Sequence, residues 1–193
     1  MTGGTLGLRD GSEVVLRPVR AADKSLLADG FVRLSPESRY RRFLAPVPEL
    51  SEAQLRYFTD IDHHDHEALA ALDPVTGRGV GIARFVRLAD RPQVAEAAVT
   101  VADDWQGRGL GTLLVEALAQ RAREEGILTF TALLLATNRE MLELLERIAR
   151  VRVIDRQTGT VEVEVDLPAL GIGPDLREIL RAYQRTTRSP ARP

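Results

Sequence analysis

The sequence DDWQGRGLGT occupies residues 103–112 and stands between a β-rich segment and a strongly amphipathic one. The apolar residues of the second segment, residues 109–125, recur on one helical face. A helix N-terminus offers unpaired backbone N–H groups and the positive end of the helix dipole. Glycines let this backbone approach an anion closely, and Arg108 places a cation nearby. The stretch therefore predicts a diphosphate site, with a merely flexible helix entry as the alternative.

Two other glycine-rich motifs do not fit this stretch. The chain has no GxxxxGK[ST] sequence, which excludes a P-loop. The spacing here is not GxGxxG, and segments typical of antiparallel strands precede it, which argues against a dinucleotide-binding Rossmann unit.

The remaining pattern predicts an α+β domain: antiparallel strands, then one strand–helix–strand crossover, then a hairpin. Residues 128–135 are apolar enough for a strand buried on both faces. We expect a flexible lead over residues 1–12, a single domain over 13–184 and a disordered tail over 185–193. The expected strands are 13–18, 67–72, 80–88, 94–102, 128–135, 151–154 and 160–167. The expected helices are 21–34, two short ones opened by Ser35 and Ser51, 109–125, one opened by Asn138, and 174–183.

Composition narrows the classes of function. The 193 residues suit one domain, and a hydrophobic fraction of 44% supports a real core. A net charge of −2 gives no electrostatic footprint for nucleic acid or an anionic membrane. Without cysteine there is no disulfide and no cysteine nucleophile. No signal pattern is present, and no apolar run reaches the roughly 20 residues of a membrane span, so we expect a cytoplasmic protein.

Residues 106–111, QGRGLG, resemble the Q/R-x-x-G-x-G/A signature of the GNAT superfamily of N-acetyltransferases. The flanking segments, residues 95–111 and 136–148, resemble the same superfamily. Residues 33–43 (RLSPESRYRRF) and the Ile61-Asp62 region are similar to bacterial protein-acetyltransferase-like members. The resemblance spans about residues 13–167. It implies the GNAT fold: a mixed, mostly antiparallel central sheet with a β-α-β crossover and helices on both faces.

The resemblance also implies acetyl-CoA as co-substrate, lying in a V-shaped gap between the strands at 94–102 and 128–135. Backbone groups of residues 99–101 would pair with the pantetheine amides, and one N–H would polarise the thioester carbonyl. Backbone N–H groups of residues 107–112 would hold the pyrophosphate. The implied cofactor-binding residues are Val99, Thr100, Val101, Gln106, Gly107, Arg108, Gly109, Leu110, Gly111, Thr112 and Asn138, the last at the family's pantetheine-facing position.

Glu96 is the candidate catalytic base. An alkylammonium has a pKa of about 10.4, so the attacking amine must lose a proton near neutral pH. Glu96 is the one acid in a strand of small apolar residues, and it shares a strand face with Ala98 and Thr100. Its place upstream of the glycines matches the family glutamate given that role. A solvent-facing glutamate on a strand is the alternative.

One position departs from the family pattern. Many members carry a tyrosine, as general acid toward the thiolate, where this chain has Leu145, and Ala149-Arg150 replaces their usual Gly-Phe. No tyrosine acid can therefore be assigned here. A thiol pKa of about 8.5 makes the thiolate a tolerable leaving group. With no cysteine for an acyl intermediate, direct transfer in a ternary complex is the natural hypothesis.

Two polar clusters have other interpretations. The run from His63 to His66 (HHDH) predicts a solvated loop rather than a metal site, so we expect no metal. In the family such loops border the substrate channel, where Asp62 or a histidine could touch the acceptor. The run RYRRF at residues 39–43 could attract the cofactor's 3′-phosphate or an acidic substrate. We expect instead a helix with Tyr40 and Phe43 packed inward and its arginines in water.

The predicted function is acetyl transfer from acetyl-CoA to a primary amine. The acceptor is open between a small molecule and a protein lysine, the latter on family analogy alone. The alternative is a non-catalytic acyl-CoA-binding sensor, to which the missing tyrosine gives weight. A third interpretation is a partner-binding domain that docks through its arginine-rich tail. The sequence leaves a monomer or a homodimer open and predicts neither a nucleic-acid nor a membrane partner.

Overall fold

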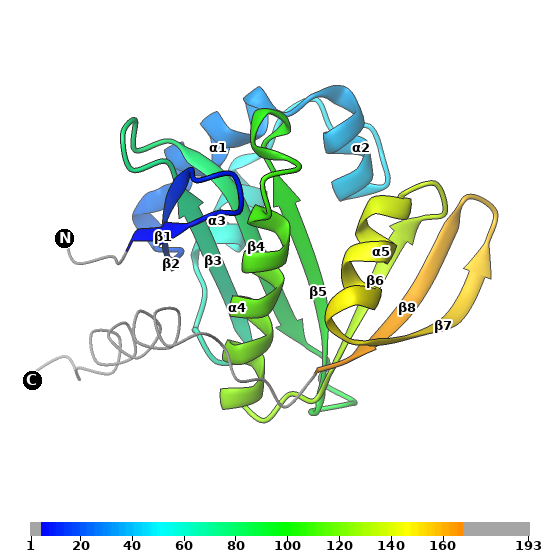
Figure 1. The fold of residues 1–193 in the computed structure, drawn as a ribbon. Helices are drawn as coiled ribbons and strands as arrows, with labels where there is room; N and C mark the ends of the chain where they lie inside the picture. Colours follow the sequence, from blue (N-terminus) through cyan, green and yellow to red (C-terminus); the bar gives the residue numbers. More distant parts are fainter. Residues whose placement is uncertain (1–4, 168–193) are drawn as a thin grey trace, which may run out of the picture.

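The computed structural model describes residues 5–167. Within them, eight strands form one sheet in the order β1-β2-β3-β4-β5-β6-β8-β7 (Figure 1). All neighbouring strands are antiparallel except β5 and β6. This is the mixed, mostly antiparallel sheet that the sequence predicts. The strands are β1 Thr5–Gly7, β2 Glu13–Pro18, β3 His66–Leu72, β4 Gly79–Arg87, β5 Val94–Val101, β6 Thr129–Leu135, β7 Arg150–Gln157 and β8 Thr160–Asp166.

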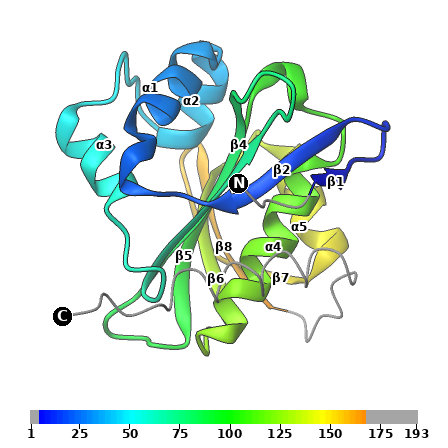
Figure 2. The ribbon, with the colours of Figure 1, turned by 90° about the vertical axis from the view of Figure 1, so that its left-hand side faces the viewer.

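Helices cover both faces of the sheet. Helices α1 to α3 lie on one face, and α4 and α5 lie on the other (Figure 2). Helix α4 connects the parallel strands β5 and β6, as the predicted crossover requires. The helices are α1 Lys24–Arg33, α2 Pro36–Phe43, α3 Glu52–Thr59, α4 Leu110–Glu124 and α5 Arg139–Ile148, with 3-10 turns η1 Ala21–Asp23 and η2 Asp103–Trp105.

Capping residues set the helix ends where the sequence places them. The Ser35 hydroxyl accepts a hydrogen bond from Ser38 N at 3.1 Å, with Pro36 next in the first helical position. Ser51 and Gln54 form a reciprocal capping box on α3. The Asn138 side chain accepts from Met141 N at 3.3 Å on α5. Gly126 ends α4 with φ +79°, a conformation that glycine adopts without steric cost.

Two cores of unequal size flank the sheet. The larger lies on the α4 side and contains Phe85, Leu114 and Leu118. It also takes the inward valines of β8, which alternate with acidic residues as predicted. The smaller core lies on the side of α1 to α3; its buried members are Val19, Ala68 and Ala70.

The sheet opens between its two parallel strands. Strands β5 and β6 pair only over Val94–Glu96 and Thr129–Thr131. Beyond that register β6 pairs with β8, while β5 continues to pair with β4 up to Val101. The expectation that residues 128–135 are buried on both faces is therefore wrong: Leu133 is 51% exposed because it borders this opening.

The lead predicted over residues 1–12 is wrong for Thr5–Gly7, which pair with β2 as a strand. Leu6 is buried and belongs to the larger core. A three-residue strand is too short to show a period in the sequence. The helix predicted at 174–183 and the tail at 185–193 lie outside the described residues. In residues 5–167 no helix has the length and apolar character needed to cross a membrane.

Candidate functional site

A gap between β5 and β6 starts immediately after Glu96. Although β5 lies inside the sheet order, its residues 97–101 are only partly buried, and Glu96 is exposed. By comparison, Leu69 on β3, another strand with a neighbour on each side, is fully buried. The difference arises because no strand pairs with the free edge of β5 from residue 97 onward. The opening lies between the two strands for which the family resemblance implies a gap.

The glycine-rich turn presents its backbone beside this gap. Gly107 and Gly109 have φ of +75° and +92°, which side chains rarely adopt. Within the described chain, no side chain caps the N-terminus of α4. A Cβ placed on Gly107 would meet no atom within 4 Å, so the space over this backbone is open. At Gly109 the Arg9 side chain lies close to the backbone, with its Cγ 3.2 Å from the place of a Cβ. An uncapped 15-residue helix preceded by open backbone at Gly107 suits an anion such as a diphosphate.

Side chains around the turn hold its shape. The Gln106 amide donates to Val101 O at 3.2 Å, which ties the turn to the end of β5. The Arg108 guanidinium donates to Asp104 O at 2.6 Å and stacks on Trp105, 4.8 Å from the ring centroid. Trp105 packs against the larger core. The Leu110 side chain is also buried, so only the backbone N–H of Leu110 could reach a ligand.

Asp103 links the turn to helix α2. Its carboxylate accepts from Ser35 N at 2.8 Å, Ser35 Oγ at 2.8 Å and Ser38 Oγ at 2.7 Å. Partial burial opposes ionisation of Asp103, but these hydrogen bonds outweigh it and lower the pKa. Helix α2 is thereby fixed beside the end of β5.

Helix α5 borders the turn on the other side. A Cβ on Gly111 would lie 3.1 Å from Leu144 Cδ1, so any larger residue there would displace the Leu144 side chain where α4 packs against α5. Asn138 caps α5, which gives its side chain a structural role beside any contact with ligand. Leu145, at the position of the family tyrosine, is 7% exposed and packs in the larger core.

Glu96 lies on the β5 face that looks toward α1 to α3. On the same face, Ala98 and Thr100 line a cavity, whereas Ala97 and Val99 pack against the core on the other face. The period-2 prediction that places Glu96 with Ala98 and Thr100 is confirmed. Glu96 is exposed and lies opposite Val86 on β4 and Thr131 on β6, at the last paired position before the gap.

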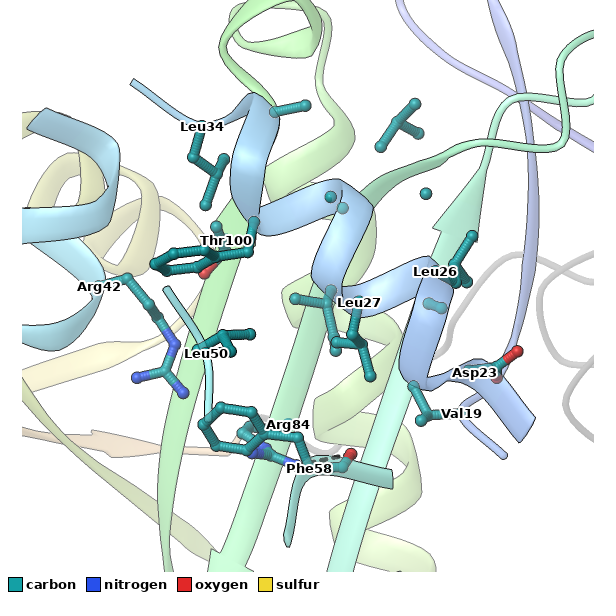
Figure 3. A pocket seen from close by; sticks show the side chains of 18 of the residues that line it. Val19, Asp23, Leu26, Leu27, Leu34, Arg42, Leu50, Phe58, Arg84 and Thr100 are labelled. Carbon is teal, nitrogen blue, oxygen red and sulfur yellow. Dashed lines mark hydrogen bonds between the residues drawn. The ribbon is translucent and has the colours of Figure 1, made fainter. Parts of the chain in front are cut away.

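The cavity itself lies between the sheet and helices α1 and α2 and measures about 100 Å³ (Figure 3). Most of its lining is apolar, but three charged residues take part: Arg42 from α2, Arg84 from β4, and Asp23, which forms an ion pair with Arg17. Arg84 is only 7% exposed, and its guanidinium carbon lies 4.4 Å from the Phe58 ring centroid. Arg84 was not among the site residues predicted from the sequence. The one feature that distinguishes it in the sequence is its charge between the apolar residues of β4.

The prediction for residues 39–43 is wrong in detail. Tyr40 is 46% exposed, and Arg42 lines the cavity. Because Ser38 at the buried position of α2 fixes which face turns inward, Arg42, four residues later, shares that face. Burial lowers the pKa of Arg42, and the nearby Glu96 carboxylate opposes that effect.

The histidine-rich loop has protein partners. His63 Nδ1 lies 2.8 Å from Glu67 Oε1, and His64 contacts Glu125. His66 Nε2 lies 2.8 Å from Arg84 Nη2. Burial, followed by the Arg84 charge, lowers the pKa of His66 to about 4, so the ring is neutral at pH 7 and accepts this hydrogen bond. Among residues 5–167, no group of three or more acidic or histidine side chains is arranged to hold a metal.

The fold, the parted strands and the uncapped glycine turn together define a GNAT domain. The family model described as "Acetyltransferase (GNAT) family" matches residues 33–149. The chain belongs to this family, which confirms the resemblance seen in residues 106–111.

Two curated relatives carry acetyltransferase names. The chain is 35% identical over 185 residues to acetyltransferase Pat of Mycolicibacterium smegmatis, covering 96% of this chain and 55% of that protein. It is 39% identical over 139 residues to acetyltransferase PA5475 of Pseudomonas aeruginosa, covering 71% of this chain and 74% of that protein. The chain thus spans about half the length of the first relative.

Solved structures agree on the fold. The crystal structure of the GNAT domain of S. lividans PAT superimposes with a TM-score of 0.78 at 34% identity, covering 86% of this chain and 97% of that chain. The yncA protein of Salmonella typhimurium, solved with its cofactor acetyl-CoA, has a TM-score of 0.64 at 16% identity and covers 82% of this chain and 96% of that chain. At that identity it supports the fold alone.

Proposed function

We propose that this protein is an N-acetyltransferase that moves an acetyl group from acetyl-CoA to a primary amine. The observation that carries the proposal is the gap after Glu96, which opens beside an uncapped helix N-terminus. Membership of the acetyltransferase (GNAT) family supports the reaction class. The resemblance of residues 106–111 to the GNAT signature, in a chain of that family, supports acetyl-CoA as the acyl donor.

The residues around the gap suit a thioester donor of this shape. The free edge of β5 at residues 99–101 offers backbone groups for the pantetheine amides, and one of their N–H groups would stabilise the thioester oxygen as negative charge develops. The turn at residues 107–112 offers N–H groups and a helix dipole to the pyrophosphate. Asn138 sits at the start of α5, close to where the pantetheine would pass.

Glu96 would accept one proton from the substrate ammonium, directly or through one water, and so give the neutral amine that attacks. The C–N bond then forms as the C–S bond breaks, the nitrogen loses its second proton to water, and CoA departs as a thiolate. Buried Leu145 supplies no acid for that thiolate. Its departure therefore depends on its own acidity, with a pKa of about 8.5 for an ordinary thiol. A protein lysine and a small amine are both acceptors of the required chemistry.

Thiol release from acetyl-CoA, measured with a panel of amines and lysine peptides, tests the proposal. We expect turnover with at least one acceptor and a fall in kcat of about 10²-fold or more for Glu96→Gln, with acetyl-CoA binding retained. Glu13→Gln is the matched control, because Glu13 is an exposed strand glutamate on β2, at the other end of the sheet. Binding without turnover on every acceptor would instead identify a sensor. No binding of acetyl-CoA would contradict both interpretations.

A further inference from the structure

The cavity beside Glu96 contains a buried arginine with an unused hydrogen-bond donor. Arg84 Nη2 donates to Phe58 O at 3.2 Å and to His66 Nε2. Arg84 Nε is buried and has no acceptor among the described residues. A buried donor without a partner costs about 1–3 kcal/mol, and native proteins keep few of them. An acceptor atom of a ligand bound in the cavity would satisfy this donor.

A second guanidinium lines the same cavity. Arg42 is partly buried, and among residues 5–167 no ion pair joins a carboxylate to either arginine. Burial, and then the charge of Arg42, lowers the pKa of Arg84 to about 10, so the two cations disfavour one another. Charges removed from water in this way are ordinarily offset by a counter-charge. The Glu96 carboxylate partly offsets the charge of Arg42. An anionic ligand group would supply the counter-charge of Arg84.

Apart from the two arginines, Thr100 and Asp23, whose carboxylate pairs with Arg17, the lining of the cavity is apolar. Leucines from α1 and from the segment before α3 point into it, including Leu27, Leu34 and Leu50 (Figure 3). An apolar cavity of about 150 Å³ holds benzene, so one of about 100 Å³ has room for about four carbon atoms. That is the size of a short branched aliphatic group rather than of an aromatic ring.

The cavity and Glu96 are close together on one strand face. Ala98 and Thr100 line the cavity, and Glu96 precedes Ala98 by two positions, about 7 Å along a strand. Arg42 lies near both the cavity and Glu96, since it lines the cavity and the Glu96 charge raises its pKa. One compact molecule could therefore set its amine at Glu96, an anionic group at the arginines and an aliphatic group in the cavity.

We propose that the acceptor is a small amine that carries a carboxylate and a short aliphatic group, the chemistry of an aliphatic α-amino acid. Arg84 and Arg42 bind the carboxylate, because ionised acceptors form the stronger hydrogen bonds with guanidinium groups. The apolar cavity takes the side chain. This inference rests on the proposed acetyl transfer and concerns only its acceptor.

Leucine and leucinamide test it, because they share the amine and the side chain and differ in the carboxylate. We compare kcat/KM for thiol release, expressed per concentration of neutral amine. The expected preference for leucine is about ten-fold or more, since a hydrogen bond to a charged group contributes about 1.5–3 kcal/mol. Arg84→Gln and Arg42→Gln should each reduce this preference about ten-fold.

Arg152→Gln is the charge-matched control, because Arg152 lies on β7 and pairs with Glu164 and Asp166. It should keep the wild-type preference. If Arg84→Gln fails to fold by circular dichroism, the wild-type ratio and Arg42→Gln decide. Equal use of leucine and leucinamide, or faster turnover of a blocked lysine peptide, overturns this inference while leaving acetyl transfer established. Absence of thiol release with every amine overturns the proposed function itself.

Discussion

Acid is expected to destabilise the fold through His66, whose folded pKa is about 4 against an ordinary value of 6.5. Burial and the neighbouring Arg84 disfavour the charged ring in the folded state. The unfolded chain therefore binds the proton more readily, and stability falls as the pH drops from 6.5 toward 4. Above that window both states are neutral, and below it both are protonated.

The magnitude follows from the two pKa values. A shift from 6.5 to about 4 corresponds to a ceiling of about 3 kcal/mol, at 1.36 kcal/mol per pKa unit. Between about pH 7.5 and pH 5.0, linkage predicts that His66 alone removes about 2 kcal/mol from the free energy of unfolding. His66→Gln has no titrating ring, and its amide oxygen can still accept from Arg84. It should lose this part of the pH dependence.

Urea unfolding gives the free energy of unfolding of the wild type and of His66→Gln at the two pH values. The contribution of His66 is the change with pH in the wild type minus the change with pH in the variant. Other titrating groups cancel in that comparison. His64→Gln is the control: it removes a histidine of the same loop whose side chain is 63% exposed, and it leaves His66 in place. Parallel pH dependence in the wild type and His66→Gln, within about 0.5 kcal/mol, would refute the reasoning.

Three further substitutions follow from the packing and the turn. Gly81→Ala should destabilise by about 1–3 kcal/mol in urea unfolding, since its Cβ would lie 2.8 Å from Leu114 Cδ1; an unchanged midpoint would argue against that close approach. Asp103→Ala should cost about 1–3 kcal/mol by removing the acceptor of three hydrogen bonds, whereas Asp104→Ala, a neighbouring carboxylate, should cost less. Gly107→Val places its Cβ in open space but strains a backbone with φ +75°, so it should lower stability by about 1–2 kcal/mol. It should also weaken acetyl-CoA binding, measured by titration; unaltered affinity would speak against a role for this backbone.

The elements with strong local signals were predictable from the sequence. Alternation at residues 160–166 predicted a strand with one buried face, and Val163 is indeed fully buried. The serine caps at Ser35 and Ser51 predicted where α2 and α3 begin. These features depend on neighbouring residues, so one sequence is enough to reveal them.

Features that depend on contacts between residues far apart in the sequence could not be predicted from local sequence patterns. Which side chains of α2 turn inward is decided by the contact of Ser38 with Asp103, 65 positions away, and so Arg42 was placed on the wrong side. Strand β1 is defined by pairing with β2 rather than by its own pattern. The exposure of Leu133 follows from the parting of β5 and β6, which strand composition does not encode.

Titration calorimetry of the wild-type protein with acetyl-CoA tests the central claim most directly, because that claim concerns binding at the opening between β5 and β6 before any chemistry. We predict saturable binding at one site per chain, with affinity that falls as salt rises, because the pyrophosphate is held by charge. A titration without saturable heat, repeated at several temperatures so that a near-zero enthalpy cannot hide binding, would contradict it.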